Sequence, residues 1–173
     1  GTKTDVAVTL ERTVAKIAVQ ASTTAEFSER YSGKVRINSA VLSKAASRSN
    51  LIAQQTPNTG PMTFTHTQAA DELSGKFRNL FYVPENGELA EGSRLLLTLG
   101  ATYDRDGNFS TTDDQAEVTY PVELSGDGAG RFLRNGYYRV QALIDGLTGS
   151  ELSVSISVAD WEAPVTQSVN LGQ

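Results

Sequence analysis

Residues 95–124 read LLLTLGATYDRDGNFSTTDDQAEVTYPVEL and decide the fold class. The segment opens with the longest apolar alternation in the chain, at Leu95, Leu97, Leu99, Ala101 and Tyr103. A period of two predicts a half-buried strand, because successive side chains of a strand point to opposite faces of its sheet. Asp106-Gly107 then predicts a hairpin turn. The partner strand is expected to place four apolar residues on one face, at Val118, Tyr120, Val122 and Leu124.

The same period recurs along most of the chain. Shorter alternating segments occupy residues 15–19, 35–41, 138–144, 152–158 and, more weakly, 165–171, and residues 80–83 predict a short buried strand that ends at Pro84. Seven or more short strands with regular turn signals predict an all-β, antiparallel β-sandwich. Residues 43–75 are the one irregular segment, in which 43–51 favours a short helical turn and Pro57–Pro61 interrupts any strand.

Length and composition narrow the function classes. The 173 residues fit a single domain, residues 1–173. A net charge of −5 disfavours nucleic acid as a partner, because binding to phosphates requires a concentrated basic face. Without cysteine the chain has no disulfides and no thiolate chemistry. No apolar run approaches the ~18 residues that a membrane-spanning helix needs.

No set of residues assembles into a catalytic site. His66 is the only histidine, so neither a catalytic triad nor a multi-histidine metal site can form around it. We interpret His66 as a polar residue on an edge strand. The glycines of 126–130 lead into a strand and not into a helix, which excludes a phosphate loop. Arg131, Arg134 and Arg139 are interpreted as a solvated rim. The prediction is a protein that is not an enzyme.

One acidic turn invites comparison with a calcium-binding loop. The run from Asp104 to Asn108 places Asp, Asp and Asn at the spacing of the first three ligands. The match ends there, because position six is Phe109 instead of Gly and position twelve is Gln115 instead of Glu. Residues 113–114 leave only a loose surface cation site as a minor alternative. We therefore expect no metal and no cofactor.

Trp161, the only tryptophan, follows the alternating segment 152–158. Its two interpretations are a ring that stacks on a ligand and an anchor that closes the sandwich. We favour the structural anchor.

Five short motifs, taken in order, resemble the fimbrillins, the pilins of type V pili from anaerobic Gram-negative bacteria. They are LERTVAKI (10–17), FYVPEN (81–86), YPV (120–122), RNGYYRV (134–140) and ISVADW (156–161). Each motif alone is weak, but five in the right order are fairly specific. The resemblance covers the second of the family's two domains, so the chain is either an excised domain or a shortened relative.

The resemblance implies a transthyretin-like β-sandwich and a structural or accessory role in a bacterial fimbria. Members of the family are displayed on the outer membrane as lipoproteins, so the expected location is the cell surface. Any membrane attachment would use a lipid anchor outside this chain. The expected partners are other fimbrial subunits, with a host or bacterial surface protein or glycan as an adhesion target.

Fimbrillins assemble when one subunit donates a strand to the next, and residues 162–173 are the candidate assembly strand here. Val165, Val169 and Leu171 share one parity, as a donated strand requires. Pairing of this segment within its own domain is an equally good interpretation of the pattern.

Two other functions remain open from the sequence. The first is a surface carbohydrate-binding module that stacks sugars on exposed aromatic side chains, with Tyr103, Phe109, Tyr137 and Tyr138 as candidates. The second is a hydrolase whose paired carboxylates lie within the irregular segment 43–75.

Overall fold

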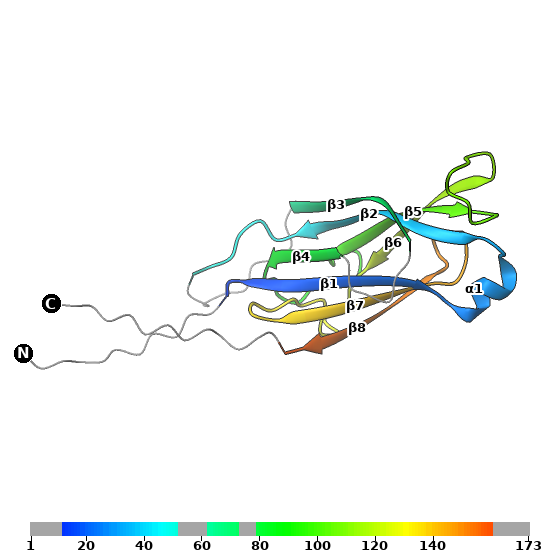
Figure 1. Cartoon of the computed structure of the whole chain (residues 1–173). Helices are drawn as coiled ribbons and strands as arrows, with labels where there is room; N and C mark the ends of the chain where they lie inside the picture. Colours follow the sequence, from blue (N-terminus) through cyan, green and yellow to red (C-terminus); the bar gives the residue numbers. More distant parts are fainter. Residues whose placement is uncertain (1–11, 52–61, 73–78, 161–173) are drawn as a thin grey trace, which may run out of the picture.

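Two four-stranded sheets pack face to face in the computed structural model, which describes residues 12–51, 62–72 and 79–160 (Figure 1). The elements are β1 (Val14–Thr23), α1 (Ala25–Arg30), β2 (Lys34–Ala45), β3 (Met62–Glu72), β4 (Asn79–Pro84), β5 (Leu96–Asp104), β6 (Gln115–Glu123), β7 (Tyr137–Ile144) and β8 (Leu152–Ala159). One sheet has the order β4-β1-β7-β8 and the other β3-β2-β5-β6. The predicted all-β sandwich is confirmed.

One pair of strands departs from the predicted antiparallel arrangement. β1 and β7 run parallel, with Ile17 opposite Tyr138 and Val19 opposite Val140. Parallel neighbours cannot be joined by a tight turn, so the chain visits the other sheet between them. The alternation within each strand does not reveal this pairing.

The β5–β6 hairpin forms with the expected partners, Leu97 opposite Val122 and Leu99 opposite Tyr120. Its connection differs from the predicted tight turn. Residues 105–114 form a longer loop, in which Gly107 takes the positive φ of 74°. Asp106-Gly107 therefore starts this loop and does not by itself close the hairpin.

Part of the segment predicted to be irregular is regular strand. β2 continues to Ala45 through a bulge, where Lys44 has a φ of 60°, and no helical turn forms at 46–51. β3 then pairs with β2 at the edge of its sheet, with His66 opposite Ala40. The edge-strand position predicted for His66 is confirmed.

The helix of the described chain lies elsewhere, at α1. Thr24 caps it by accepting a hydrogen bond from the Phe27 N–H (3.2 Å), a contact that satisfies one free donor of the first turn. Phe27 is buried in the core. Six residues with a single buried side chain give no helical period, so the sequence did not predict this helix.

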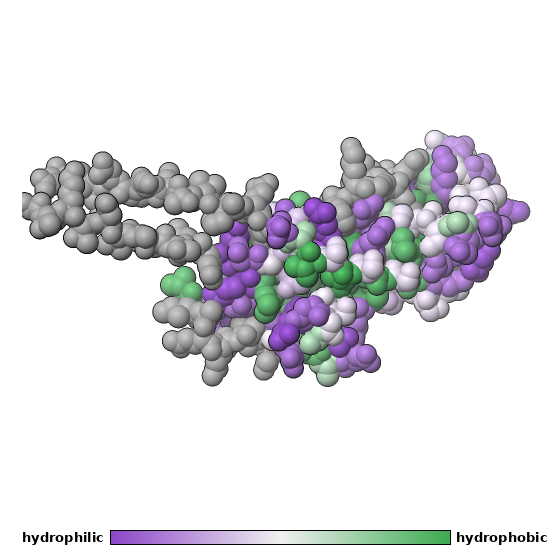
Figure 2. Space-filling model, turned by 90° about the horizontal axis from the view of Figure 1, so that it is seen from below, coloured by the Kyte–Doolittle hydropathy of each residue, from purple (hydrophilic) through white to green (hydrophobic). Residues whose placement is uncertain are grey.

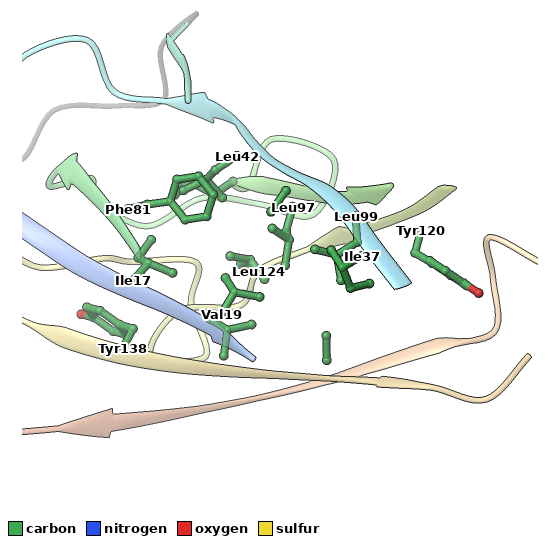
Figure 3. Packing of buried hydrophobic residues seen from close by; sticks show 14 of the residues in the cluster. Ile17, Val19, Ile37, Leu42, Phe81, Leu97, Leu99, Tyr120, Leu124 and Tyr138 are labelled. Carbon is green, nitrogen blue, oxygen red and sulfur yellow. The ribbon is translucent and has the colours of Figure 1, made fainter. Parts of the chain in front are cut away.

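The core lies between the two sheets and is built by the alternation of their strands. Ile17, Phe81 and Tyr138 from one sheet face Leu42 and Leu97 from the other (Figure 3). All five side chains are essentially inaccessible to solvent. Full burial of each such side chain stabilises the fold by about 1.5–3 kcal/mol.

The sandwich has two distinct ends. β1 begins and β8 finishes at the same end, because Tyr137 lies between Lys16 and Ala159 in the sheet (Figure 1). We call this the terminal end. The opposite end, called the helix end, carries α1, the loop 105–114 and the turn 145–151.

Candidate functional site: the open edge of β8

The outermost strand of one sheet, β8, leaves an apolar face only partly covered. Its inward residues Leu152, Val154 and Ile156 pack on the core but stay half-buried, and Val158 is 64% exposed. Their four partners on β7 are all buried. The inward side chains are therefore buried on β7 but half-buried or exposed on the neighbouring strand β8. We call Leu152, Val154, Ile156 and Val158 the β8 edge.

The backbone of this edge is unpaired on its outer side. The Asp145 N–H donates to the Glu151 carbonyl (2.9 Å). Hydrogen-bonded pairs alternate along an antiparallel ladder, so this bond shows which residues of β8 bond to β7 and which do not. By that alternation, the N–H and C=O groups of the β8 edge point away from β7. No strand of the described chain pairs there.

The sequence of β8 carries none of the usual protection of a free edge. Its residues, LSVSISVA, include no charged side chain and no proline. Natural sheets usually protect their edges with lysine, proline, bulges or a covering loop. A strand without such features leaves a row of backbone groups that can serve as a template for another strand.

The edge of the second sheet, β6, is protected in several ways. The Leu124 N–H donates to the Leu95 carbonyl (2.8 Å), so by the alternation of the β5–β6 ladder the backbone nitrogen of Pro121 faces the free edge. Proline has no N–H, and this position therefore offers no donor to an added strand. Gly149 approaches the edge so closely that a Cβ on it would lie 2.7 Å from the Thr119 carbonyl oxygen. Among the described residues, the two edges on this side of the sandwich thus differ, because β6 is protected and β8 is not.

Figure 2 views the molecule from below, the side on which β8 lies in Figure 1. Apolar residues gather in the middle of this face, and hydrophilic residues cover the helix end. The partial burial of the β8 edge is consistent with this distribution.

At the terminal end, a buried ion pair joins two of the sequence motifs. Arg134 donates through Nε to Glu85 Oε1 (2.9 Å) and through Nη2 to the Asn50 carbonyl (2.6 Å) and Ser49 Oγ (3.3 Å). Hydrogen bonds from Arg134 lower the pKa of Glu85 and outweigh the opposite effect of burial. The prediction of a solvated rim is wrong for Arg134, whose side chain is 10% exposed.

Neighbouring motif residues are also structural. Asn86, wholly buried, donates through Nδ2 to the Gly130 carbonyl (2.7 Å), and its N–H donates to the Phe132 carbonyl (3.0 Å). Asn135 donates its N–H to the Val14 carbonyl (2.9 Å) from a left-handed backbone, φ 59°. These contacts hold the terminal end together.

The carboxylates that come together in the structure lie at the helix end. Asp104, Asp106 and Asp114 each place one oxygen within 4.8 Å of the others. The comparison with a calcium loop had grouped the first two with Asn108. Asp114, which the sequence offers with Asp113 only as a loose surface cation site, joins them from the far end of the loop.

The predicted assembly strand and anchor lie outside the described residues. This holds for Val165, Val169 and Leu171, the assembly strand candidates, and for Trp161. Their roles stay predictions. In the described part of the chain, no helix is long and apolar enough to cross a membrane.

The prediction that exposed aromatic rings stack sugars is wrong for two of its four candidates. Tyr103 and Tyr138 are buried, at 8% and 2% exposure. Phe109 packs on the guanidinium of Arg36, 3.7 Å from its ring centroid. Tyr137 is half-buried on the outer face of its sheet.

No protein-family model matches the chain, and no curated protein sequence matches it. Solved structures do share its fold. One is a candidate cell adhesion protein from Parabacteroides distasonis ATCC 8503. The alignment covers 91% of this chain and 54% of the length of that protein, at 15% sequence identity and a TM-score of 0.54. A second such protein from the same organism aligns with 88% and 60%, at 16% identity and a TM-score of 0.51.

The tip fimbrial protein Mfa3 from Porphyromonas gingivalis aligns with 87% of this chain and 52% of its own, at 16% identity and a TM-score of 0.46. The chain therefore spans little more than half the length of the structures it matches. The resemblance inferred from the five motifs is confirmed at the level of the fold.

Proposed function

We propose that this chain is a domain of a structural or accessory subunit of a bacterial fimbria, acting at the cell surface in adhesion and without catalysis. The observation that carries the proposal is the open β8 edge. The ordered motifs and the fold shared with candidate cell adhesion proteins support it.

Assembly would proceed by addition of a strand. A strand from another subunit would gain ladder hydrogen bonds along β8 and would cover its half-buried apolar side chains. The segment that this chain would donate in turn is 162–173, with its apolar residues at alternate positions. Its partners are thus other fimbrial subunits, and a lipid anchor outside this chain would attach the fibre to the outer membrane.

Removal of residues 163–173 from the full-length protein tests the donor role. Fibre formation, followed by electron microscopy, is expected to stop while the domain still folds. A matched pair of triple variants sharpens the test: Val165, Val169 and Leu171 changed to serine should block assembly, and Thr166, Ser168 and Asn170 changed to alanine should not. Normal fibres from the deletion variant would show that the donor role is wrong.

Glycan binding is the second candidate function, and one observation favours it. Lys16 lies between Tyr82 and Tyr137 in the sheet, with Nζ 4.4 Å from the Tyr137 ring centroid. Tyr82 is 50% exposed. Aromatic rings beside a cation suit an acidic sugar. A glycan array followed by Tyr82→Ala and Tyr137→Ala tests this, and the absence of any ligand at micromolar affinity would count against it.

A further inference from the structure

The sheet formed by β4, β1, β7 and β8 contains no acidic residue in its strands. Their sequences, NLFYVP, VAKIAVQAST, YYRVQALI and LSVSISVA, include neither aspartate nor glutamate, although the whole chain has 20 such residues. The strands of the other sheet contain five of them. Two cations are present in the acid-free sheet, Lys16 and Arg139. A positive sheet on a protein of net charge −5 raises the local concentration of anions.

Both cations lie on the outer face of this sheet, the face turned away from the core. Their neighbours along each strand are buried in the core, so the period of two places Lys16 and Arg139 on the other side. Tyr82, Lys16 and Tyr137 form one row across β4, β1 and β7. Arg139 follows two residues along β7 and is opposite Ser157 of β8. The outer face thus brings two cations and two aromatic rings together.

The ring of Tyr137 contacts both cations. Lys16 Nζ is 4.4 Å and Arg139 Cζ 5.3 Å from the centroid of this ring. The two charges are therefore no farther apart than the sum of these distances, and they repel each other. An anion that contacts both cations relieves this repulsion. Because the ring already positions them, binding costs less side-chain freedom.

Aromatic and amide side chains extend the same face. Tyr82 is 50% exposed, and Tyr137 is half-buried. Gln20 and Gln141 lie opposite each other on β1 and β7, and Gln141 is exposed. Aromatic rings offer an apolar surface on which a sugar ring stacks. Amides both donate and accept hydrogen bonds, as the hydroxyl groups of a sugar do. The surroundings of the two cations therefore suit a carbohydrate better than a small inorganic anion.

We propose that this outer face binds a polysaccharide whose sugars carry carboxylate groups, an inference that rests on the second candidate function above. Arg139 holds one carboxylate through its planar fork of donors, and Lys16 holds a second as a point charge. The three strands β4, β1 and β7 extend over about 10 Å, which is wider than one sugar ring. The ligand is therefore a chain of acidic sugars that lies across these strands.

Calorimetric titration of the 173-residue chain with a hexamer of galacturonic acid tests the proposal. The same hexamer with methyl-esterified carboxyl groups is the matched control, because it keeps the sugar rings and removes the charge. We expect a Kd below about 1 mM for the acid and binding about tenfold weaker for the ester. Affinity for the acid should also fall as the NaCl concentration rises from about 0.05 to 0.5 M.

Charge changes at Ser157 give a test that a misfolded variant cannot imitate. Ser157→Lys adds a cation beside Arg139 and should tighten binding of the acidic hexamer about twofold to fivefold, whereas Ser157→Glu should weaken it by a similar factor. Arg139→Gln should weaken binding as well. Arg105→Gln removes an exposed arginine from the helix end and should leave the Kd unchanged.

The outcomes separate this proposal from the functions proposed above. Equal binding of the acid and its methyl ester would overturn it while glycan binding as such still stood. No binding of the acid below about 1 mM, or equal effects of Arg139→Gln and Arg105→Gln, would overturn it too. Fibre formation by the full-length protein should stay normal in Arg139→Gln, because assembly uses the β8 edge. A failure of the assembly role would therefore be seen independently of the titrations.

Discussion

Arg134 and Glu85 form a buried ion pair that joins the chain before β7 to the chain after β4, at the terminal end of the sandwich. The same guanidinium holds the carbonyl of Asn50. Three segments distant in sequence are therefore fixed by one side chain. Both partners are almost inaccessible to solvent, which makes the loss of either one costly.

Glu85→Gln and Arg134→Met are each expected to lower the free energy of unfolding by about 3–5 kcal/mol, because each leaves a buried charge without its partner. Urea denaturation measures the effect. Arg131 provides a control, since its pair with Asp127 is far more exposed, and Arg131→Met should cost less than about 1 kcal/mol. Equal losses at both sites would contradict the importance of burial here.

The contribution of Glu85 should depend on pH. Arg134 lowers the pKa of the folded-state Glu85 below its ordinary value of 4.5. The carboxylate therefore stabilises the fold above pH 4.5, and this stabilisation is lost as pH falls through the lower folded-state pKa. The difference in unfolding free energy between wild type and Glu85→Gln should be constant near neutral pH and shrink in acid. A difference that grows below pH 4.5 would contradict this.

Tyr120 should impose a limit on stability in alkali. Its hydroxyl is buried and donates to the Gly146 carbonyl (2.7 Å), and burial raises its pKa to about 12. Since the unfolded side chain ionises near pH 10, the fold loses stability as pH rises from 10 toward 12. Tyr120→Phe should cost about 1–3 kcal/mol at neutral pH and should flatten this alkaline decline. Thermal unfolding at pH 7–11 would detect both effects, and an unchanged decline would contradict the assignment.

Asn135 should tolerate glycine better than alanine. Its φ of 59° lies in the left-handed region, which costs most residues roughly 1–2 kcal/mol and asparagine less. Asn135→Ala is therefore expected to lower the unfolding free energy by about 1 kcal/mol, and Asn135→Gly by about half of that or less. Equal losses in chemical denaturation would mean that the Arg12 contact to Asn135 Oδ1 matters more than the backbone conformation.

Much of the fold could be predicted because most strands reveal one buried face in their own sequence. β5 and β6 were identified with the correct partners, as Leu99 and Tyr120 show. The parallel pairing of β1 with β7 could not be predicted, because it depends on how the sheets close in space. α1 was missed because only Phe27 among its six residues is buried.

The candidate sites, too, could be predicted from the sequence only in part. Arg134 was mistaken for a surface residue because Glu85 lies 49 positions away. The partial burial of the β8 edge depends on what packs over it in space, which the alternation of residues 152–159 does not reveal. The sequence placed Asp114 near the acidic turn, but only the folded loop brings its carboxylate within 4.8 Å of those of Asp104 and Asp106.

The central claim, that the β8 edge accepts a strand from another subunit, is tested most directly by a single charged residue. Val158→Lys places a cation on the exposed inner side of this edge, where its own domain loses little burial. Ser157→Lys adds the same charge one residue away on the exposed outer face of β8. Fibre yield of the full-length protein, measured by electron microscopy beside thermal unfolding, should fall sharply for Val158→Lys and stay normal for Ser157→Lys. Normal fibres from Val158→Lys would contradict the account.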